Sequence, residues 1–307
     1  MVTVCVVVAN ALGFAPQATL SPRAARAHPP IMSAADITSA WQPAILDKLV
    51  SSLSLQSKEY AVDLGFDTFD VNGASGTVVS YEGAGKPNVA WLSGLTLSDG
   101  SDVARCSLTA WVGPLSDVPH LMASCGVADG AVTLSIDFPT RAECAYEPSG
   151  VYEEPTTREA FAMGGNRKDF AAAFYTEDLI AWRDGLLGLP GAQNSPLSAE
   201  EMAAQSASPL YLDLRLPLTD DSATAAAAAC VKASEAWLEW MLTSTEKKRD
   251  LPAGAKQTQV YARDTKLKTN AYGMLLRKYT SAYGEAGTGL AAADAGPLDE
   301  AYVGGGS

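Results

Sequence analysis

The chain of 307 residues is 47% hydrophobic and 19% charged, a balance that supports a sizeable core and excludes a largely disordered protein. Its 22 basic and 35 acidic residues give a formal net charge of −13. Because the neutralisation of nucleic-acid phosphates requires clustered cations, this charge argues against nucleic acid as a general partner.

The first part of the chain has the composition of a targeting leader. Residues 2–14 form an apolar run that is too short to span a membrane as a helix, and an arginine- and serine-containing segment without any acid before Asp36 follows it. This order resembles the two-part leaders of proteins sent to plastids of red-algal secondary origin, and a secretory signal is the alternative. We therefore predict a leader over residues 1–31, a location in the plastid (chloroplast stroma), and a mature chain without a membrane span.

Residues 33–55 repeat apolar side chains at helical spacing and predict an entry helix. From residue 64 to residue 138 the apolar period becomes two, which is typical of strands. Four dipeptides that favour tight turns interrupt this region: Asn72-Gly73, Glu82-Gly83, Asp99-Gly100 and Asp129-Gly130. Consecutive hairpins of this kind imply an antiparallel sheet.

The second half of the chain is mainly helical in pattern. The expected elements are a helix over 168–187, a short helix capped by Ser198 and Glu201, a strand over 210–216, and an alanine-rich helix over 221–247. Strands first and helices mainly later predict an α+β fold, a three-layer α/β/α sandwich with a central antiparallel sheet flanked by helices. We expect a single domain over residues 32–290 and a flexible tail over 291–307.

The cysteines of the mature chain, Cys106, Cys125, Cys144 and Cys230, are widely spaced and have no histidine beside them. This spacing does not match a zinc or iron–sulfur site, so no metal is expected. The interpretation that we favour is that the thiols are small buried apolar groups.

A basic segment covers residues 247–278. It holds nine of the 22 basic residues and only two acids, Asp250 and Asp264. Such a segment on an acidic protein predicts a surface that steers an acidic protein partner or holds substrate carboxylates. The alternative is an ordinary solvated helix face whose cations compensate the helix dipole.

His120 is the only histidine that remains once the leader is removed, so it is the one side chain whose ordinary pKa lies near neutrality. It follows a proline and precedes an alternating strand that ends in an acid, Asp137, and a base, Arg141. His120 is therefore the candidate for proton exchange near neutral pH. A strand-end or backbone contact for His120, and an ion pair between Asp137 and Arg141, are the alternatives.

Six segments occur in an order that resembles a known family: 107–111, 117–121, 134–141, 152–154, 208–211 and 263–269. The family is red chlorophyll catabolite reductase, a relative of the ferredoxin-dependent bilin reductases. It carries an acid five residues after the proline of the second segment, where this chain has Ser124. A second family acid is expected near the C-terminus, where this chain has Asn270 or Gly273.

The resemblance implies reduction of a double bond in a linear tetrapyrrole, red chlorophyll catabolite to fluorescent chlorophyll catabolite, in chlorophyll breakdown. Reduced ferredoxin would supply the electrons, with no bound metal or flavin, and a homodimer is a further possibility. The implied proton-transfer candidates are His120, Asp137, Asp264 and Ser124, the last by holding a water. The implied substrate-binding residues are Arg141, Lys266, Lys268 and Tyr272.

Three other functions remain open at this stage. Without the two family acids, the same pocket would suit a carrier or scavenger that binds a bilin and does not convert it. A reductase of haem-derived bilins would use the same chemistry on another substrate. A bilin lyase would attach a chromophore and would not depend on an electron donor.

Overall fold

The computed structural model describes residues 33–83, 89–100, 103–113, 118–140, 174–198, 201–202, 207–246 and 257–296, with only the backbone described for 244–246 and 257–264. All of these residues fall within one compact unit, Met32–Ser307. Among them, no helix is long and apolar enough to cross a membrane.

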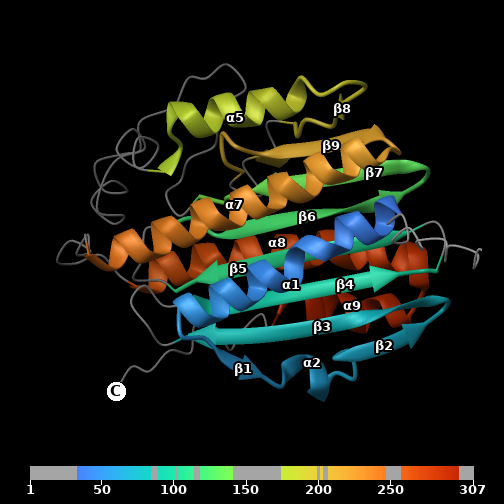
Figure 1. Cartoon of the computed structure of the whole chain (residues 1–307). Helices are drawn as coiled ribbons and strands as arrows, with labels where there is room; N and C mark the ends of the chain where they lie inside the picture. Colours follow the sequence, from blue (N-terminus) through green and yellow to red (C-terminus); the bar gives the residue numbers. More distant parts are fainter. Residues whose placement is uncertain are drawn as a thin grey trace, which may run out of the picture. The chain divides into compact units, whose positions relative to one another are not determined.

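Within the described ranges, nine strands form one sheet in which each pairing is antiparallel (Figure 1). The strand order is β1-β3-β4-β5-β6-β7-β9-β8, and β2 pairs with β3. The bounds are β1 Gln56–Lys58, β2 Thr68–Val71, β3 Ala74–Gly83, β4 Val89–Ser98, β5 Ala104–Val112, β6 Leu121–Ala128, β7 Ala131–Asp137, β8 Gln193–Asn194 and β9 Leu212–Pro217. The predicted antiparallel sheet is confirmed.

Two of the predicted turns set the hairpin geometry directly. Asn72 and Gly73 join β2 to β3 with φ values of 49° and 85°, and Asp129 and Gly130 join β6 to β7 with values of 49° and 69°. Two consecutive residues with positive φ are the requirement of a type I′ turn, whose twist matches that of the flanking strands. The Asn-Gly and Asp-Gly dipeptides therefore fix the register of these two hairpins.

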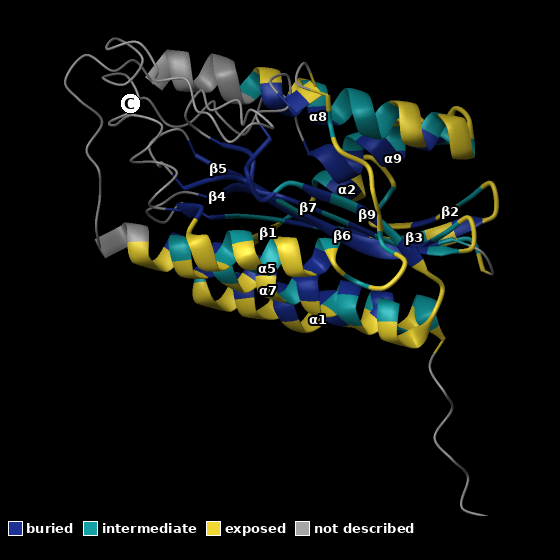
Figure 2. Ribbon diagram, turned by 90° about the horizontal axis from the view of Figure 1, so that it is seen from above, coloured by how far each residue is buried: buried dark blue, intermediate teal, exposed yellow. Residues whose placement is uncertain are grey.

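Helices cover both faces of the sheet (Figure 2). One face carries α1 (Ala34–Ser52), α5 (Glu177–Leu187) and α7 (Asp220–Glu246), and the other carries α8 (Gln257–Tyr283) and α9 (Ala286–Ala295). A single turn of helix, α2 (Tyr60–Asp63), lies between β1 and β2 in sequence. The predicted three-layer α/β/α arrangement is thus confirmed.

The main hydrophobic core lies between the sheet and the α1–α7 layer. Alternate residues of the central strands, such as Leu108, Leu121 and Leu134, point into it and are fully buried. Trp237 of α7 is buried in the same core, and its indole N–H donates to the carbonyl of Pro119 at 2.9 Å. Because apolar side chains gather on this face, the layer contributes mainly to stability.

The three described cysteines are part of this core. Cys106, Cys125 and Cys230 are free and buried, and burial raises the pKa of the Cys106 and Cys230 thiols. They behave as small apolar residues, as the sequence predicts. Cys144 lies outside the described residues.

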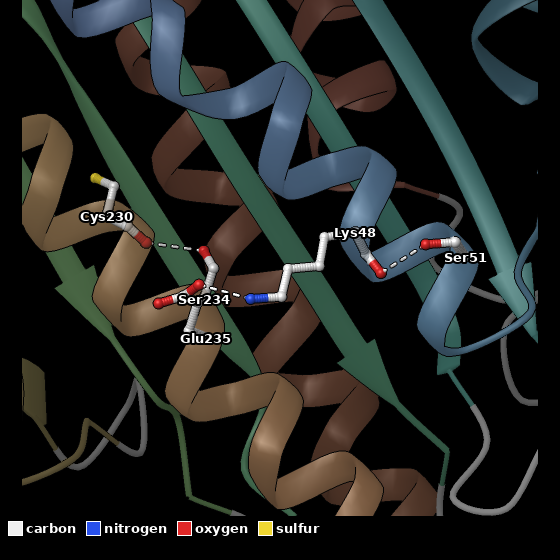
Figure 3. Close-up of polar contacts among 5 residues, drawn as sticks. All are labelled: Lys48, Ser51, Cys230, Ser234 and Glu235. Atoms are coloured by element: carbon white, nitrogen blue, oxygen red, sulfur yellow. Dashed lines mark hydrogen bonds and ion pairs between the residues drawn. The ribbon is translucent and has the colours of Figure 1, made fainter.

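One polar contact that joins α1 and α7 lies at the outer surface of the layer (Figure 3). Lys48 of α1 and Glu235 of α7 form an ion pair at 2.6 Å, and both side chains are about half exposed. Exposed pairs of this kind contribute about 0–1 kcal/mol. The two helices are therefore held mainly by the apolar core beneath them.

Element bounds differ from the sequence expectations mainly at the C-terminal end. The helix α8 was not predicted, and α9 continues into the segment for which we predicted a flexible tail from residue 291. Leu290, Ala291 and Asp294 are buried in α9. The prediction was wrong for residues 291–296, because small residues let α9 pack tightly against α8 and bury a segment whose glycine and alanine content suggested a tail.

The other helix bounds agree more closely. The helix predicted over 168–187 begins at Glu177 in the described part of the chain, with Thr176 as its N-cap. The capping box is confirmed, since Ser198 N–H donates to Glu201 at 2.9 Å and Glu201 N–H donates back to Ser198 at 3.2 Å.

Candidate functional site

The two faces of the sheet differ sharply in chemistry. Where β5, β6, β7 and β9 send apolar side chains toward α1 and α7, the intervening residues point toward α8 because successive side chains alternate. On β5 to β9, most of these intervening residues are polar: Arg105, Ser107, Ser124, Thr133, Ser135, Asp213 and Arg215. The α8 face is therefore the candidate ligand-binding face.

Strand register brings some of these side chains into one line across the sheet. Ser107 of β5 pairs with Ser124 of β6, Ser124 pairs with Ser135 of β7, and Ser135 pairs with Asp213 of β9. Directly opposed residues in an antiparallel sheet share a face. We call Ser107, Ser124 and Ser135 the serine row, and Asp213 lies at its end.

A cavity of about 390 Å³ lies over this part of the sheet. Ser124, Ser135, Asp213, Arg105 and Arg215 line it from the strands, and α8 closes it with Lys278, Tyr279, Ala282 and Tyr283. Small-molecule sites typically occupy about 300–1,000 Å³ and combine apolar walls with a few convergent polar groups. This polar cavity has both properties.

The charged groups around the polar cavity are coupled to one another. Asp294 of α9 accepts a hydrogen bond from the Tyr279 hydroxyl at 2.8 Å. Burial lowers the pKa of Arg105, but Tyr279 and Asp294 outweigh this effect and the pKa is raised overall. The charge of Arg105, together with burial, lowers the pKa of Lys278 to about 7. The cavity thus places the permanent positive charge of Arg105 near Lys278, whose ammonium group loses its proton at a lower pH than usual.

Several polar atoms on the α8 side of the described sheet are buried without a hydrogen-bond partner. They are Arg105 Nε, Ser107 Oγ, Trp91 Nε1, Trp111 Nε1 and Thr265 Oγ1. Buried donors and acceptors are nearly always satisfied in folded proteins. Of these atoms, Arg105 Nε belongs to a residue that lines the polar cavity, which is consistent with a ligand or water that completes its hydrogen bond.

His120 is fully buried at the start of β6 and lines neither of the cavities described. Its Nδ1 accepts a hydrogen bond from the Val112 backbone N–H at 3.0 Å, and its ring packs edge-on against Trp111 with 4.7 Å between centroids. A ring nitrogen that accepts from a backbone N–H carries no proton of its own. The structure therefore places His120 in a backbone contact, the first of the alternatives stated for it.

Asp137 lies at the end of β7 on the α8 face. Its Oδ1 accepts three hydrogen bonds, from the Phe138 N–H at 2.8 Å, the Ser208 N–H at 3.0 Å and the Ser208 hydroxyl at 2.7 Å. Burial raises its pKa to about 7, although these hydrogen bonds act in the opposite direction. Asp137 is thus an acid with an unusual pKa that also ties two distant segments together.

The cavity beside Asp137 is much smaller than the polar cavity. It has a volume of about 10 Å³ and is lined mainly by apolar groups, among them Trp111, Met122 and Leu267. Such a space holds at most one water molecule. Asp137 and the serine row therefore face different cavities on the same side of the sheet.

The remaining sequence candidates lie apart from one another. Ser124 lines the polar cavity, Lys266 is exposed on α8, and Tyr272 is half-buried and packs against the hydrophobic cluster that includes Leu95 and Tyr279. Lys268 is 1% exposed, with its ammonium 5.9 Å from the centre of the Trp111 ring. Arg141 lies outside the described residues, and so does the side chain of Asp264. The structure brings His120, Asp137 and Ser124 onto one face without placing them around one cavity.

Sequence reasoning missed Arg105, Asp213 and Arg215, which line the polar cavity, whereas Lys278 belongs to the basic segment that it singled out. A signal for Asp213 was present, because Tyr211, Asp213 and Arg215 alternate with the leucines of the predicted strand over 210–216. A strand that is apolar on one face and charged on the other indicates a functional or solvated second face. Arg105 had no comparable signal, and the sequence did not predict that Lys278 lies near it, since their proximity depends on how α8 packs on the sheet.

No known family profile matches the chain, and no curated protein matches it in sequence. Among solved structures, the fold matches phytochromobilin synthase from tomato, crystallised in complex with biliverdin. The TM-score is 0.54, and the match covers 82% of this chain and 80% of that chain at 11% sequence identity. At this identity the match concerns the fold. The chain therefore shares the α+β sandwich fold of that structure.

Proposed function

We propose that this protein is a ferredoxin-dependent reductase of a linear tetrapyrrole, of the red chlorophyll catabolite reductase type. The observation that carries the proposal is the polar cavity of about 390 Å³, with cations on two of its walls, in a fold shared with a protein crystallised with biliverdin. In this proposal the substrate is red chlorophyll catabolite, and the product is fluorescent chlorophyll catabolite. The protein acts in the plastid stroma, with no bound metal or flavin.

The chemistry of the cavity fits a ligand that has an apolar ring system and acidic side groups. Apolar residues such as Leu97 and Val103 and the aromatic rings of Tyr279 and Tyr283 offer surfaces for pyrrole rings. Arg105, Arg215 and Lys278 offer positive charge for carboxylates, and guanidinium groups bind carboxylates in a bidentate manner. These cations take the substrate-binding role that the sequence suggested for other basic residues.

Reduction of one double bond takes two electrons and two protons. In the proposal, two reduced ferredoxins each deliver one electron, and the protons come from acids of the protein that are replenished by solvent. Lys266 and Arg277 are exposed on α8 and belong to the basic segment 247–278. We propose this segment as the docking surface for the acidic electron carrier, whose binding weakens as salt is added.

One observation favours a second candidate, a bilin carrier without turnover. The serine row offers hydroxyls where a catalytic acid is expected at Ser124, and a hydroxyl is far too weak an acid to replace a carboxyl. A carrier would use the same cavity and the same cations. The two candidates differ in whether the bound ligand changes when electrons are supplied.

The test is an anaerobic incubation of the protein with reduced ferredoxin and red chlorophyll catabolite, in parallel with biliverdin. Absorbance and fluorescence of the extracted products are recorded, and samples without ferredoxin serve as controls. A blue-fluorescent product that requires ferredoxin supports the proposed reductase. Conversion of biliverdin alone assigns the haem-derived substrate, and binding of both ligands without change assigns the carrier.

The place of binding is tested with a matched pair of variants on α8. Lys278→Gln removes a charge that lines the cavity, whereas Arg277→Gln removes a neighbouring exposed charge that does not line it. We expect weaker tetrapyrrole binding for the first variant only. Equal binding by both variants would contradict the assignment of the ligand to this cavity.

A further inference from the structure

The proposed function leaves one chemical role unassigned, because a reductase needs an acid in contact with the ligand. Besides the weakly acidic hydroxyls of Tyr279 and Tyr283, four ionisable side chains line the polar cavity: Arg105, Asp213, Arg215 and Lys278. Of these four, Asp213 is the only carboxyl. The inference below rests on the proposed function and concerns the same cavity.

The backbone places Asp213 securely on the ligand face. It lies in β9, directly opposite Ser135, which in turn is opposite Ser124. Its sequence neighbours Leu212 and Leu214 are buried in the core on the other side of the sheet. Because side chains alternate along a strand, the Asp213 carboxyl points toward α8 and ends the serine row.

The Asp213 carboxyl is chemically available. Within the described residues, no hydrogen bond or ion pair to its side-chain oxygens is present, whereas Asp137 accepts three hydrogen bonds. Burial raises the pKa of Asp213, and the charges of Lys278, Arg105 and Arg215 act in the opposite direction. The residue is half-buried, so that solvent can return a proton to it. These are the requirements of a general acid that must be recharged after each transfer.

The two acids or bases that the sequence singled out are less well placed for this role. His120 lines neither cavity, and its Nδ1 is occupied by the Val112 N–H. Asp137 faces a space of about 10 Å³, which is too small for a pyrrole ring. Asp213 lines the polar cavity, which has a volume of about 390 Å³.

We propose that Asp213 is the acid that transfers a proton to the tetrapyrrole bound in the polar cavity. As ferredoxin supplies an electron to the ligand, the Asp213 O–H bond breaks, a new bond to hydrogen forms on the ligand, and Asp213 becomes a carboxylate. Arg105, Lys278 and Arg215 stabilise that carboxylate until solvent returns the proton. The second electron and second proton complete the reduction of one double bond.

The experiment compares Asp213→Asn and Asp213→Glu with Asp137→Asn as the matched control. Biliverdin is the binding probe, because its absorption spectrum reports protonation of its pyrrole nitrogens. Three quantities are measured for each protein. They are the Kd for biliverdin, the absorption spectrum of bound biliverdin between pH 5 and pH 9, and the turnover of red chlorophyll catabolite and of biliverdin with reduced ferredoxin. Circular dichroism spectra confirm that each variant is folded.

We expect Asp213→Asn to lower kcat by about 10²–10⁴-fold, the usual contribution of a general acid, with a Kd within a few-fold of wild type. It should also change the pH dependence of the bound pigment's absorption. Asp213→Glu keeps the carboxyl and should retain substantial turnover, and Asp137→Asn should retain the wild-type pH profile. A purely structural role for Asp213 would not produce this separation of kcat from Kd.

The outcomes separate failure of this inference from failure of the proposed function. If wild type converts a tetrapyrrole and Asp213→Asn does so equally well, Asp213 is not the acid and the reductase assignment stands. If wild type binds biliverdin and red chlorophyll catabolite but converts neither, the reductase assignment fails, and an unchanged pH titration of bound biliverdin in Asp213→Asn then rejects the inference as well. If wild type does not bind either tetrapyrrole, both are overturned.

Discussion

Asp137 provides the sharpest link between the structure and a measurable stability. Burial raises its pKa to about 7 from the ordinary value of 3.8, while its carboxyl accepts hydrogen bonds from Phe138 and Ser208. Between these two pH values the unfolded chain releases the proton and the folded protein retains it. The unfolded state binds fewer protons in this range, so stability falls as pH rises from about 4 to about 7.

The size of the effect follows from the two pKa values. Each tenfold difference in proton affinity corresponds to about 1.4 kcal/mol, so that this single group costs the folded protein about 4 kcal/mol at pH 7 relative to pH 4. Asp137→Asn keeps the side-chain oxygen that accepts the three hydrogen bonds and removes the ionisation. The variant should therefore match wild type near pH 4 and be more stable by up to about 4 kcal/mol above pH 7.

The assay is urea unfolding monitored by tryptophan fluorescence at several pH values between 4 and 8. Asp70→Asn, which alters an exposed acid on β2, serves as the control and should follow the wild-type curve. A free energy of unfolding for Asp137→Asn that runs parallel to wild type across this range would refute the reasoning. It would mean that the pKa of Asp137 in the folded protein is close to its value in the unfolded chain.

Three further predictions concern the cavity and the core. Lys278→Gln should raise the Kd for biliverdin several-fold at low salt and less at high salt, whereas Arg277→Gln should leave it unchanged, as measured by absorbance titration. Ser124→Glu adds a carboxyl inside the cavity, so it should raise turnover from a measurable wild-type baseline; a carrier would remain inactive with this substitution. Trp237→Phe removes the donor to the Pro119 carbonyl and should lower the free energy of unfolding by about 1–3 kcal/mol in urea, because a buried acceptor is left unsatisfied.

Local signals in the sequence predicted the sheet well, because they depend on near neighbours. The alternation within strands and the Asn72-Gly73 and Asp129-Gly130 dipeptides define hairpins without knowledge of the rest of the chain. The antiparallel order of β2 to β7 follows from these hairpins. The placement of Ser124 and Asp137 on one face also follows from strand parity.

The contents of the site depend on contacts between distant parts of the chain. Asp213 meets Ser135 only through strand register, and Lys278 meets Arg105 only when α8 packs on the sheet. Asp137 was predicted as a proton donor from the family resemblance, yet two of its hydrogen bonds come from Ser208, about seventy residues later. The periodicity within one segment does not indicate such pairs. The sequence therefore predicted which residues share a face of the sheet, but not which side chains from distant segments come together there.

The unequal chemistry of the two sheet faces has a consequence for how such a protein changes over evolutionary time. Residues that stabilise the fold and residues that contact a ligand alternate along the same strands, yet they belong to separate layers. Ser124 and Ser135 line the polar cavity, whereas Leu134 and Trp237 pack in the core on the other side of the sheet. Under the proposed function, substitutions on the cavity face would change substrate or catalysis at little cost to the core.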